Sequence, residues 1–214
     1  MILYGASLSP FVRKVLIYCA EKGIAIERKS IGPGDADPDF RRASPFGKIP
    51  ALIDGDFALA DSSAIVTYLE AKHPEPSMTP ADPRERAQAV WLEEFADTIL
   101  APAGLAVFFN MFIAPMVGVT PDMAAADKAR RETLPPILDY VETVLPEDGG
   151  PLAGGMVTVA DIAIACQIAN IAYCGIDLDD GGRRPKLARF HAAWCERPSA
   201  RELVAGNRAV LAQG

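Results

Sequence analysis

The order of strand-like and helix-like stretches in residues 1–73 restricts the fold more than any other feature of this 214-residue sequence. Residues 1–5 and 24–29 read as strands, and residues 10–23 between them carry apolar side chains at helical spacing before Gly23. Residues 49–60 read as a hairpin that turns at Asp54-Gly55, and a helix capped by Asp61 follows. The order is strand, helix, strand, a helical or irregular crossover, two strands and a helix.

This order is typical of a thioredoxin-like domain, in which the first two strands pair in parallel through a right-handed crossover. Residues 75–82 are rich in proline and polar side chains, which predicts a linker. All later stretches read as helices, over 83–116, 121–144, 159–173, 185–197 and 199–212. We expect a kink at Pro102 and a kink or break at Pro135-Pro136. The prediction is an α/β thioredoxin-like N-terminal domain over 1–74 and an all-α C-terminal domain over 83–214.

One helix start is specific. The stretch "MVTVADIAIA" places Thr158 at the N-cap and Asp161 three residues later, which is a capping box. Val157 and Ile162 stand where a hydrophobic staple requires apolar side chains. The helix that follows is apolar on nearly all sides, so we expect it to be the buried core helix of the second domain.

Composition excludes several functions. The net charge of −7 disfavours binding to nucleic acid. The apolar run near 157–172 is interrupted by polar residues and residues 1–7 do not resemble a signal peptide, so we expect no membrane span or export. The four cysteines form no C-x-x-C pair, which suits reduced thiols in the cytoplasm. With His73 and His191 as the only histidines, we expect no metal site.

The stretch "FGKIPALIDG" is unusual because Pro50 stands at the start of an apolar strand. Proline has no N–H for a sheet, so it is confined to edges, bulges and first residues of strands. Taken by itself, this proline indicates an edge strand protected from further pairing, with a trans peptide bond.

Three motifs make the chain resemble the cytosolic glutathione transferases, in particular a serine-type, bacterial-like member: "SPFVRKV", "SPFGKIPALIDGDFALADSSAIVTYL" and "GGMVTVADIAIA". The three motifs occur in the family's order, and the resemblance covers the whole chain. The resemblance implies the glutathione transferase fold and a homodimer that binds glutathione in the first domain and a hydrophobic electrophile against the second. It implies glutathione as co-substrate and no other cofactor.

The resemblance also implies positions for glutathione. Pro50 would follow a cis peptide bond, so that the backbone of Ile49 pairs with the cysteinyl part of the peptide. Asp61 and Ser62 would hold the γ-glutamyl end, with free N–H groups of the helix start. Lys48 would lie near the glycyl or cysteinyl backbone, although a solvated loop lysine is nearly as good a reading. The family's further basic residue is missing from "GDADPDFRRAS", where Arg41 or Arg42 could substitute.

The catalytic candidate is Ser9, which precedes Pro10 at a helix start. A serine there is an ordinary N-cap, but its hydroxyl can also donate to a thiolate that the helix dipole favours. Ser7 is the rival hydroxyl. Because Ser9 and Val12 stand where a C-x-x-C pair would be, disulfide exchange is disfavoured.

The electrophile site is the least readable part. Phe108, Phe109 and Phe112 lie where the resembling family walls its acceptor pocket, but such a stripe can equally be core. We expect a detoxifying glutathione transferase. The alternatives are a non-catalytic protein that binds glutathione or hydrophobic ligands, a glutathione-dependent isomerase or peroxidase, and an interaction module. Phe46 is expected to enter the partner subunit of a dimer.

Overall fold

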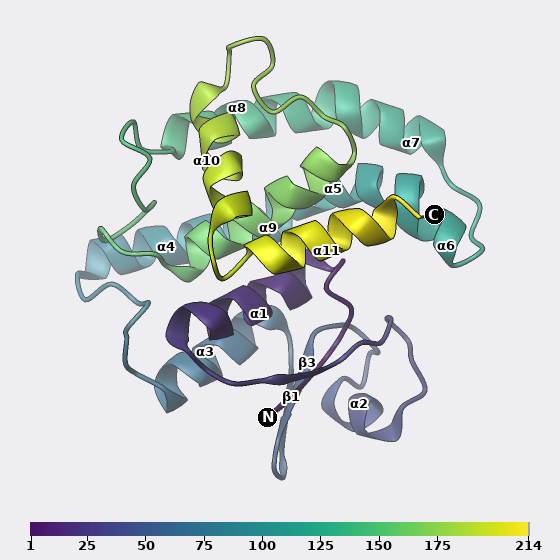
Figure 1. Cartoon of the computed structure of the whole chain (residues 1–214), viewed down its shortest axis with the longest axis vertical. Helices are drawn as coiled ribbons and strands as arrows, with labels where there is room; N and C mark the ends of the chain where they lie inside the picture. Colours follow the sequence, from purple (N-terminus) through teal and green to yellow (C-terminus); the bar gives the residue numbers. More distant parts are fainter. Residues whose placement is uncertain (214) are drawn as a thin grey trace. The chain divides into compact units, whose positions relative to one another are not determined.

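A computed structural model describes residues 1–213 (Figure 1). The chain divides into two compact units between Thr79 and Pro80, and each unit is described by itself.

The first unit contains one four-stranded sheet with three helices. Its elements are β1 (Ile2–Tyr4), α1 (Pro10–Lys22), β2 (Glu27–Lys29), α2 (Pro38–Ala43), β3 (Ala51–Asp54), β4 (Phe57–Ala60) and α3 (Ser62–Lys72). The strand order is β2-β1-β3-β4, with β1 parallel to β2 and β3 antiparallel to both of its neighbours. This is the predicted thioredoxin-like order, so the fold class of the first unit is confirmed.

The central strands β1 and β3 are buried on both faces, while β2 is exposed. Tyr4, Ala51 and Ile53 point to one face, where Phe40 and Ala43 of α2 complete an apolar cluster. Side chains alternate along a strand, so Leu3 and Leu52 point to the opposite face, and both are fully buried. On that side α3 contacts β3 and β4 and packs beside α1 (Figure 1).

The second strand is shorter than the sequence predicts. It begins at Glu27 rather than at residue 24, because the end of α1 uses the preceding residues. Gly23 adopts a left-handed conformation with φ of 67°, and the N–H of Ile24 donates to the carbonyl of Cys19 at 2.8 Å. This C-terminal cap holds Ile24 against the helix and keeps it out of the sheet.

The second unit is all-helical, as predicted. Its first segment, Pro83–Met116, is a continuous helical stretch. It consists of α4 (Pro83–Phe95), a π-helical turn η1 (Ala96–Leu100), α5 (Ala101–Phe108), a second π-helical turn η2 (Phe109–Ile113) and α6 (Ala114–Met116). The later elements are α7 (Met123–Lys128), the π-helical turn η3 (Ala129–Thr133), α8 (Leu134–Val144), α9 (Val159–Tyr173), α10 (Pro185–Glu196) and α11 (Arg201–Leu211).

The prolines inside these helices do not break them. Pro102 is the second residue after η1, and Pro135 is the second residue after η3. Proline has no N–H, so in a regular α-helix one carbonyl of the preceding turn would lack its donor. In a π-helical turn the hydrogen bonds reach one residue further, so another N–H can serve that carbonyl. The sequence allowed a break at Pro135-Pro136. That prediction is wrong, because the helix continues through α8 to Val144.

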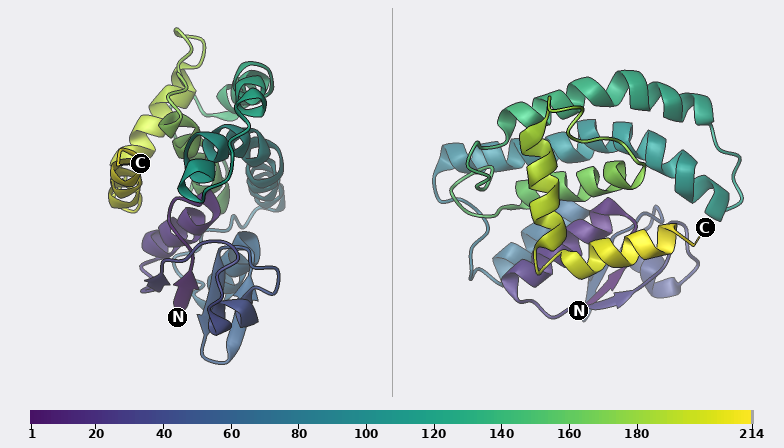
Figure 2. Two further views of the ribbon diagram at one scale, coloured as in Figure 1. Left: turned by 90° about the vertical axis from the view of Figure 1, so that its right-hand side faces the viewer. Right: turned by 45° about the horizontal axis from the view of Figure 1, so that its top comes forward.

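Helix α9 is the interior helix of this unit, as expected. Every residue from Ala160 to Ile171 is buried, and α9 contacts α4, α5 and α10 (Figure 2). Its start carries the predicted capping box. Asp161 accepts from the Thr158 N–H and hydroxyl and from the Leu152 N–H, each at 2.9 Å.

By length and composition, one helical segment among residues 1–213, Pro83–Met116, could cross a membrane, since an 18-residue window within it has a mean hydropathy of 1.8. A core helix of a globular domain satisfies the same criteria, and α4 and α5 of this segment pack on α9. One such segment is weak evidence for a membrane span.

Candidate functional site

The register of the first unit's sheet gathers three distant pieces of sequence at one end. Tyr4 lies opposite Ala51, and Ala51 lies opposite Ala60. The chain leaves or enters the sheet at each of these residues, so Gly5, Pro50 and Asp61 are the next residues at the same end. Helices α1 and α3 both begin from this end of the sheet (Figure 1). Strand pairing therefore brings the Ser9, Ile49 and Ser62 segments to one place.

Gly5 allows these segments to approach closely, and the sequence analysis missed it. Its φ is 144°, a conformation that side chains disfavour. A Cβ atom at Gly5 would lie 2.5 Å from Cγ2 of Val12 and 3.2 Å from Cβ of Ile49. The start of α1 and the segment before β3 therefore meet over Gly5. The sequence did offer one signal for this close approach, namely a glycine directly after the first strand.

Ser9 caps α1 as expected. Its backbone is extended, with φ of −67° and ψ of 123°, and its Oγ accepts from the N–H of Val12 at 3.4 Å. Pro10 occupies the first helical position. The Ser9 hydroxyl donates no hydrogen bond to the residues that the structure describes, so its proton is available to another acceptor.

The neighbouring serine is held differently. The carbonyl of Ser7 accepts from the Arg13 guanidinium at 3.2 Å. Lys14, the next residue on α1, donates from Nζ to the hydroxyl of Ser63 at 3.2 Å. These two cations tie the start of α1 to the preceding loop and to the first turn of α3. Neither was singled out from sequence, where both read as the polar face of an amphipathic helix.

The peptide bond between Ile49 and Pro50 is cis. Within residues 1–213, neither the N–H nor the C=O of Ile49 forms a hydrogen bond, so both groups are open to a ligand. The preceding residue is fixed in place. Lys48 donates its N–H to the Ser44 hydroxyl at 2.9 Å, and that hydroxyl donates to the Lys48 carbonyl at 2.7 Å, while the Lys48 side chain is exposed.

Asp61 is the N-cap of α3. Its Oδ1 accepts from the N–H groups of Ser63 at 2.9 Å and Ala64 at 3.1 Å. Its φ is 80°, which for a residue with a side chain costs on the order of 1–3 kcal/mol and persists only where the surroundings enforce it. Ser62 is buried at the first helical position, and its hydroxyl has no partner among the described residues. Capping by Asp61 leaves its second carboxylate oxygen available.

The two arginines considered for the glycyl carboxylate are engaged elsewhere. Arg41 donates from Nε to the Asp35 carbonyl at 2.5 Å and also to the Gly34 carbonyl. Arg42 donates to the Asp56 carbonyl at 3.2 Å, in the turn between β3 and β4. Arg41 lies beside the Lys48 segment, because a Cβ at Gly47 would be 3.1 Å from its Nη1.

The three phenylalanines of the second unit differ in exposure. Phe108 is an interior residue, 2% exposed, and its ring contacts those of Phe112 and Tyr173 at centroid distances of 5.4 and 6.4 Å. Phe109 is 40% exposed, and Phe112 is half-buried. Of the three, Phe109 and Phe112 present surface that a ligand can reach.

Cys19, the cysteine of α1, does not supply a reactive thiol here. Cys19 lies in the interior on α1, and burial raises the pKa of its thiol to about 12. The thiol is therefore protonated at neutral pH and is no nucleophile. Among residues 1–213, no three His, Cys, Asp or Glu side chains are grouped so that they could hold a metal ion.

Comparison with known proteins agrees in both units. Residues 3–77 match the family "Glutathione S-transferase, N-terminal domain", and residues 110–204 match "Glutathione S-transferase, C-terminal domain". The chain is 36% identical over 211 residues to glutathione S-transferase 3 of Zea mays, covering 95% of this chain and 92% of the relative.

Solved structures give the same result. A glutathione S-transferase from Rhodospirillum rubrum F11 is similar with a TM-score of 0.83 at 29% identity, over 94% of this chain and 90% of that one. A glutathione S-transferase from Methylobacterium radiotolerans, in complex with glutathione sulfonate, is similar with a TM-score of 0.77 at 28% identity, over 95% and 93% of the two chains.

Proposed function

The chain belongs to the glutathione S-transferase family, and on that premise we propose that it activates the glutathione thiol as a thiolate for attack on hydrophobic electrophiles. The observation that carries the proposal is the shared end of the first unit's sheet, where the Ser9, Ile49 and Asp61 segments meet. One tripeptide can contact all three segments only because they lie together.

Ser9 is the proposed catalytic residue. Its Oγ accepts from the Val12 N–H through a lone pair, so its proton remains free to donate to sulfur. The helix N-terminus adds a favourable potential for the anion. Lowering a thiol pKa by about two units needs only ~2.7 kcal/mol, which one charge-assisted hydrogen bond and the helix dipole can supply.

The proposed reaction needs no reactant other than the glutathione thiol and the electrophile. Glutathione loses its thiol proton to solvent, and the sulfur electron pair forms a bond to carbon. With an aryl halide the halide leaves with its bonding electrons, and with an enal the adduct takes up a proton. The proposal includes no cofactor other than glutathione as co-substrate.

The proposed anchors of glutathione are the open groups of the site. The N–H and C=O of Ile49 pair with the cysteinyl backbone as an added strand would, next to Pro50. The Ser62 hydroxyl and the free N–H groups of the first turn of α3 hold the γ-glutamyl carboxylate, while Asp61 takes its ammonium group. Lys48 lies on the glycyl side, where its exposed side chain supplies the positive charge.

The remaining parts of the proposal concern the electrophile and the setting. We propose Phe109 and Phe112 as apolar contacts of the electrophile, and we leave Phe108 to the interior. The four free cysteines suit a reducing compartment, which supports a cytoplasmic protein. The proposal includes a homodimer and a role in detoxification, by analogy with the family.

A turnover screen with glutathione tests the proposal. The purified protein is assayed with aryl halides, isothiocyanates, enals and hydroperoxides, each with and without glutathione, and binding of glutathione is measured separately by calorimetry. Conjugation of at least one carbon electrophile supports the transferase. Turnover of hydroperoxides alone indicates a peroxidase, and binding without any turnover indicates a binding protein.

A further inference from the structure

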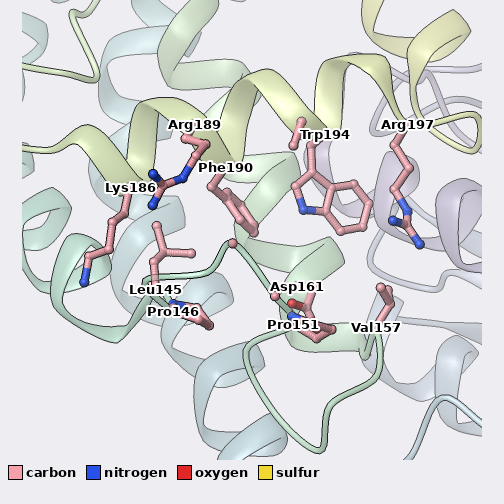
Figure 3. Close-up of a pocket in the computed structure, with 13 residues that line it drawn as sticks. Leu145, Pro146, Pro151, Val157, Asp161, Lys186, Arg189, Phe190, Trp194 and Arg197 are labelled. Carbon is pink, nitrogen blue, oxygen red and sulfur yellow. The ribbon is translucent and has the colours of Figure 1, made fainter.

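The second unit contains a hollow that the proposed glutathione chemistry does not use. It lies between α10 and the loop that joins α8 to α9, and its volume is about 140 Å³ (Figure 3). Phe190 and Trp194 of α10 form one wall, and Leu145, Pro146 and Pro151 face them from the loop. The hollow is therefore lined by aromatic and aliphatic side chains over most of its depth.

The rim of this hollow is cationic. Lys186 and Arg189 of α10 line it, together with Arg197, which directly follows the helix as its C-cap. The guanidinium of Arg197 lies 5.0 Å from the centre of the Trp194 ring, a cation–π contact. The rim of the hollow therefore carries positive charge although the net charge of the protein is −7.

The acid at the floor does not cancel this charge for a ligand. Asp161 is 2% exposed, and its carboxylate accepts from the Thr158 N–H and hydroxyl and from the Leu152 N–H. Its oxygens are directed at the start of α9 and are occupied there. An anionic group at the rim would meet the lysine and arginine groups first.

One surface glutamate now occupies part of the cationic rim. Glu147 accepts from Lys186 Nζ at 3.2 Å, and its carbonyl accepts from Arg189 at 3.0 Å. The Glu147 side chain is 88% exposed, so water screens this ion pair and the carboxylate is readily exchanged. The Lys186 side chain, in contrast, is only 14% exposed and is held by its packing.

The size of the hollow limits what can enter. An apolar cavity of about 150 Å³ holds a benzene molecule in a protein interior. A single aromatic ring therefore fits here, between Phe190 and the loop, with the Trp194 edge beside it. Figure 3 shows the indole nitrogen on the side of the ring that faces Phe190, and its N–H donates to no described residue.

We propose that this hollow binds a single-ring aromatic carboxylate, with the ring between Phe190, Trp194 and Pro151 and the carboxylate at Lys186 and Arg189 in place of Glu147. A flat apolar ring with one negative end matches a lining that is apolar in depth and cationic at one edge. The site lies wholly within the second unit and is separate from the segments proposed to bind glutathione.

Binding of 4-fluorobenzoate to the full chain, followed by fluorine NMR, tests the proposal. We expect saturable binding with a Kd of about 1 mM or tighter, and at least tenfold weaker binding of the uncharged 4-fluorobenzamide. Absence of binding at about 10 mM 4-fluorobenzoate, or equal binding of the amide, overturns the proposal.

Variants test the location of the site, because some should weaken and others should tighten the binding of 4-fluorobenzoate. Arg189→Gln should weaken 4-fluorobenzoate roughly tenfold, because it removes a charged donor. Glu147→Gln should tighten binding several-fold, because it removes the competing carboxylate. Ala193→Leu fills the hollow from α10 and should abolish binding. Circular dichroism checks that each variant is folded.

Arg208→Gln on α11 is the matched control, since it removes an exposed arginine of the same unit that does not line the hollow. It should leave the Kd unchanged. Equal effects of Arg189→Gln and Arg208→Gln would mean that net charge and no defined site attracts the anion, and the proposal is then wrong. Weaker binding in Glu147→Gln contradicts the exchange of carboxylates.

Discussion

Gly5 lies so close to Val12 that a Cβ atom at Gly5 would be 2.5 Å from Val12 Cγ2. Gly5→Ala should therefore push α1 away from the end of β1, and it also places a side chain at a φ of 144°. We expect the free energy of unfolding to fall by about 2–4 kcal/mol and the affinity for glutathione to fall with it. Urea unfolding and calorimetry measure the two quantities.

Gly32→Ala is the control for this change. A Cβ at Gly32 would meet nothing within 4 Å, so the substitution should leave stability unchanged or raise it by up to ~1 kcal/mol. If Gly5→Ala is as stable and binds as well as Gly32→Ala, the close approach is not needed for the site.

Ser9→Ala should separate catalysis from binding. The γ-glutamyl and backbone anchors remain, so the Kd for glutathione should change little. The thiol pKa in the complex should rise, kcat near neutral pH should fall by roughly one to three decades, and the pH–rate profile should move to higher pH. Stopped-flow titration of the bound thiolate absorbance measures the pKa directly.

Ser7→Ala is the matched control and should have a much smaller effect. Because loss of the α1 cap costs about 1 kcal/mol, melting of both variants under assay conditions distinguishes inactivity from unfolding. Full activity in Ser9→Ala together with loss in Ser7→Ala would assign the role to Ser7. Full activity in both would leave activation to backbone N–H groups.

Glu70 should make the stability of the chain depend on acid. Partial burial by itself would raise the pKa of the Glu70 carboxyl. Hydrogen bonds from Lys22 and Tyr18, each 2.5 Å long, and from the Met78 N–H lower this pKa by more than burial raises it. The folded pKa is therefore below the unfolded value of about 4.3. The stabilisation is fully present above the unfolded pKa and is lost as the pH falls through the folded one.

Glu70→Gln should accordingly cost about 2–3 kcal/mol at neutral pH, since it leaves the buried Lys22 without its carboxylate. The difference from the wild type should shrink below about pH 4. Urea unfolding across this range measures it, with the exposed Glu27→Gln as a control for the change in net charge. A cost that stays constant down to about pH 3 contradicts the carboxylate's role.

Asp161 should matter for folding and little for catalysis. It supplies three hydrogen bonds at the start of the interior helix α9, and burial raises the pKa of its carboxyl. Asp161→Ala leaves two backbone N–H groups without acceptors and should destabilise by about 2–4 kcal/mol. Thermal melting measures the loss. Turnover per folded molecule should be nearly unchanged, and a selective loss of kcat with normal melting would refute this reading.

Phe46 is the proposed contact with a second subunit. Its side chain is 91% exposed in the single chain, so its apolar surface is available to a second subunit. Phe46→Ala should shift the monomer–dimer equilibrium toward monomer on dilution, as sedimentation velocity can measure. Phe57→Ala, another exposed phenylalanine of the same unit, is the comparison. An unchanged dimer across dilution removes Phe46 from the interface.

Much of the fold could be predicted because its signals are local. Helical spacing of apolar side chains located α1, the Asp61 N-cap marked the start of α3, and Asp54-Gly55 marked the turn between β3 and β4. The Thr158–Asp161 capping box was predicted for the same reason, since its members are three residues apart. Errors arose where local geometry competes, as at Ile24, which the cap of α1 withholds from β2.

The sequence by itself determined how α1, α3 and α9 begin, because N-caps depend on neighbours a few positions away. Only the tertiary structure decided that Gly5, Ile49 and Asp61 lie at one end of a sheet, since strand register pairs residues that are far apart in the chain. It also decided that Phe108 is interior while Phe109 is exposed, because burial depends on which helices pack against that face. The cationic hollow on α10 needed the loop before α9 as its second wall, and no local pattern places that loop.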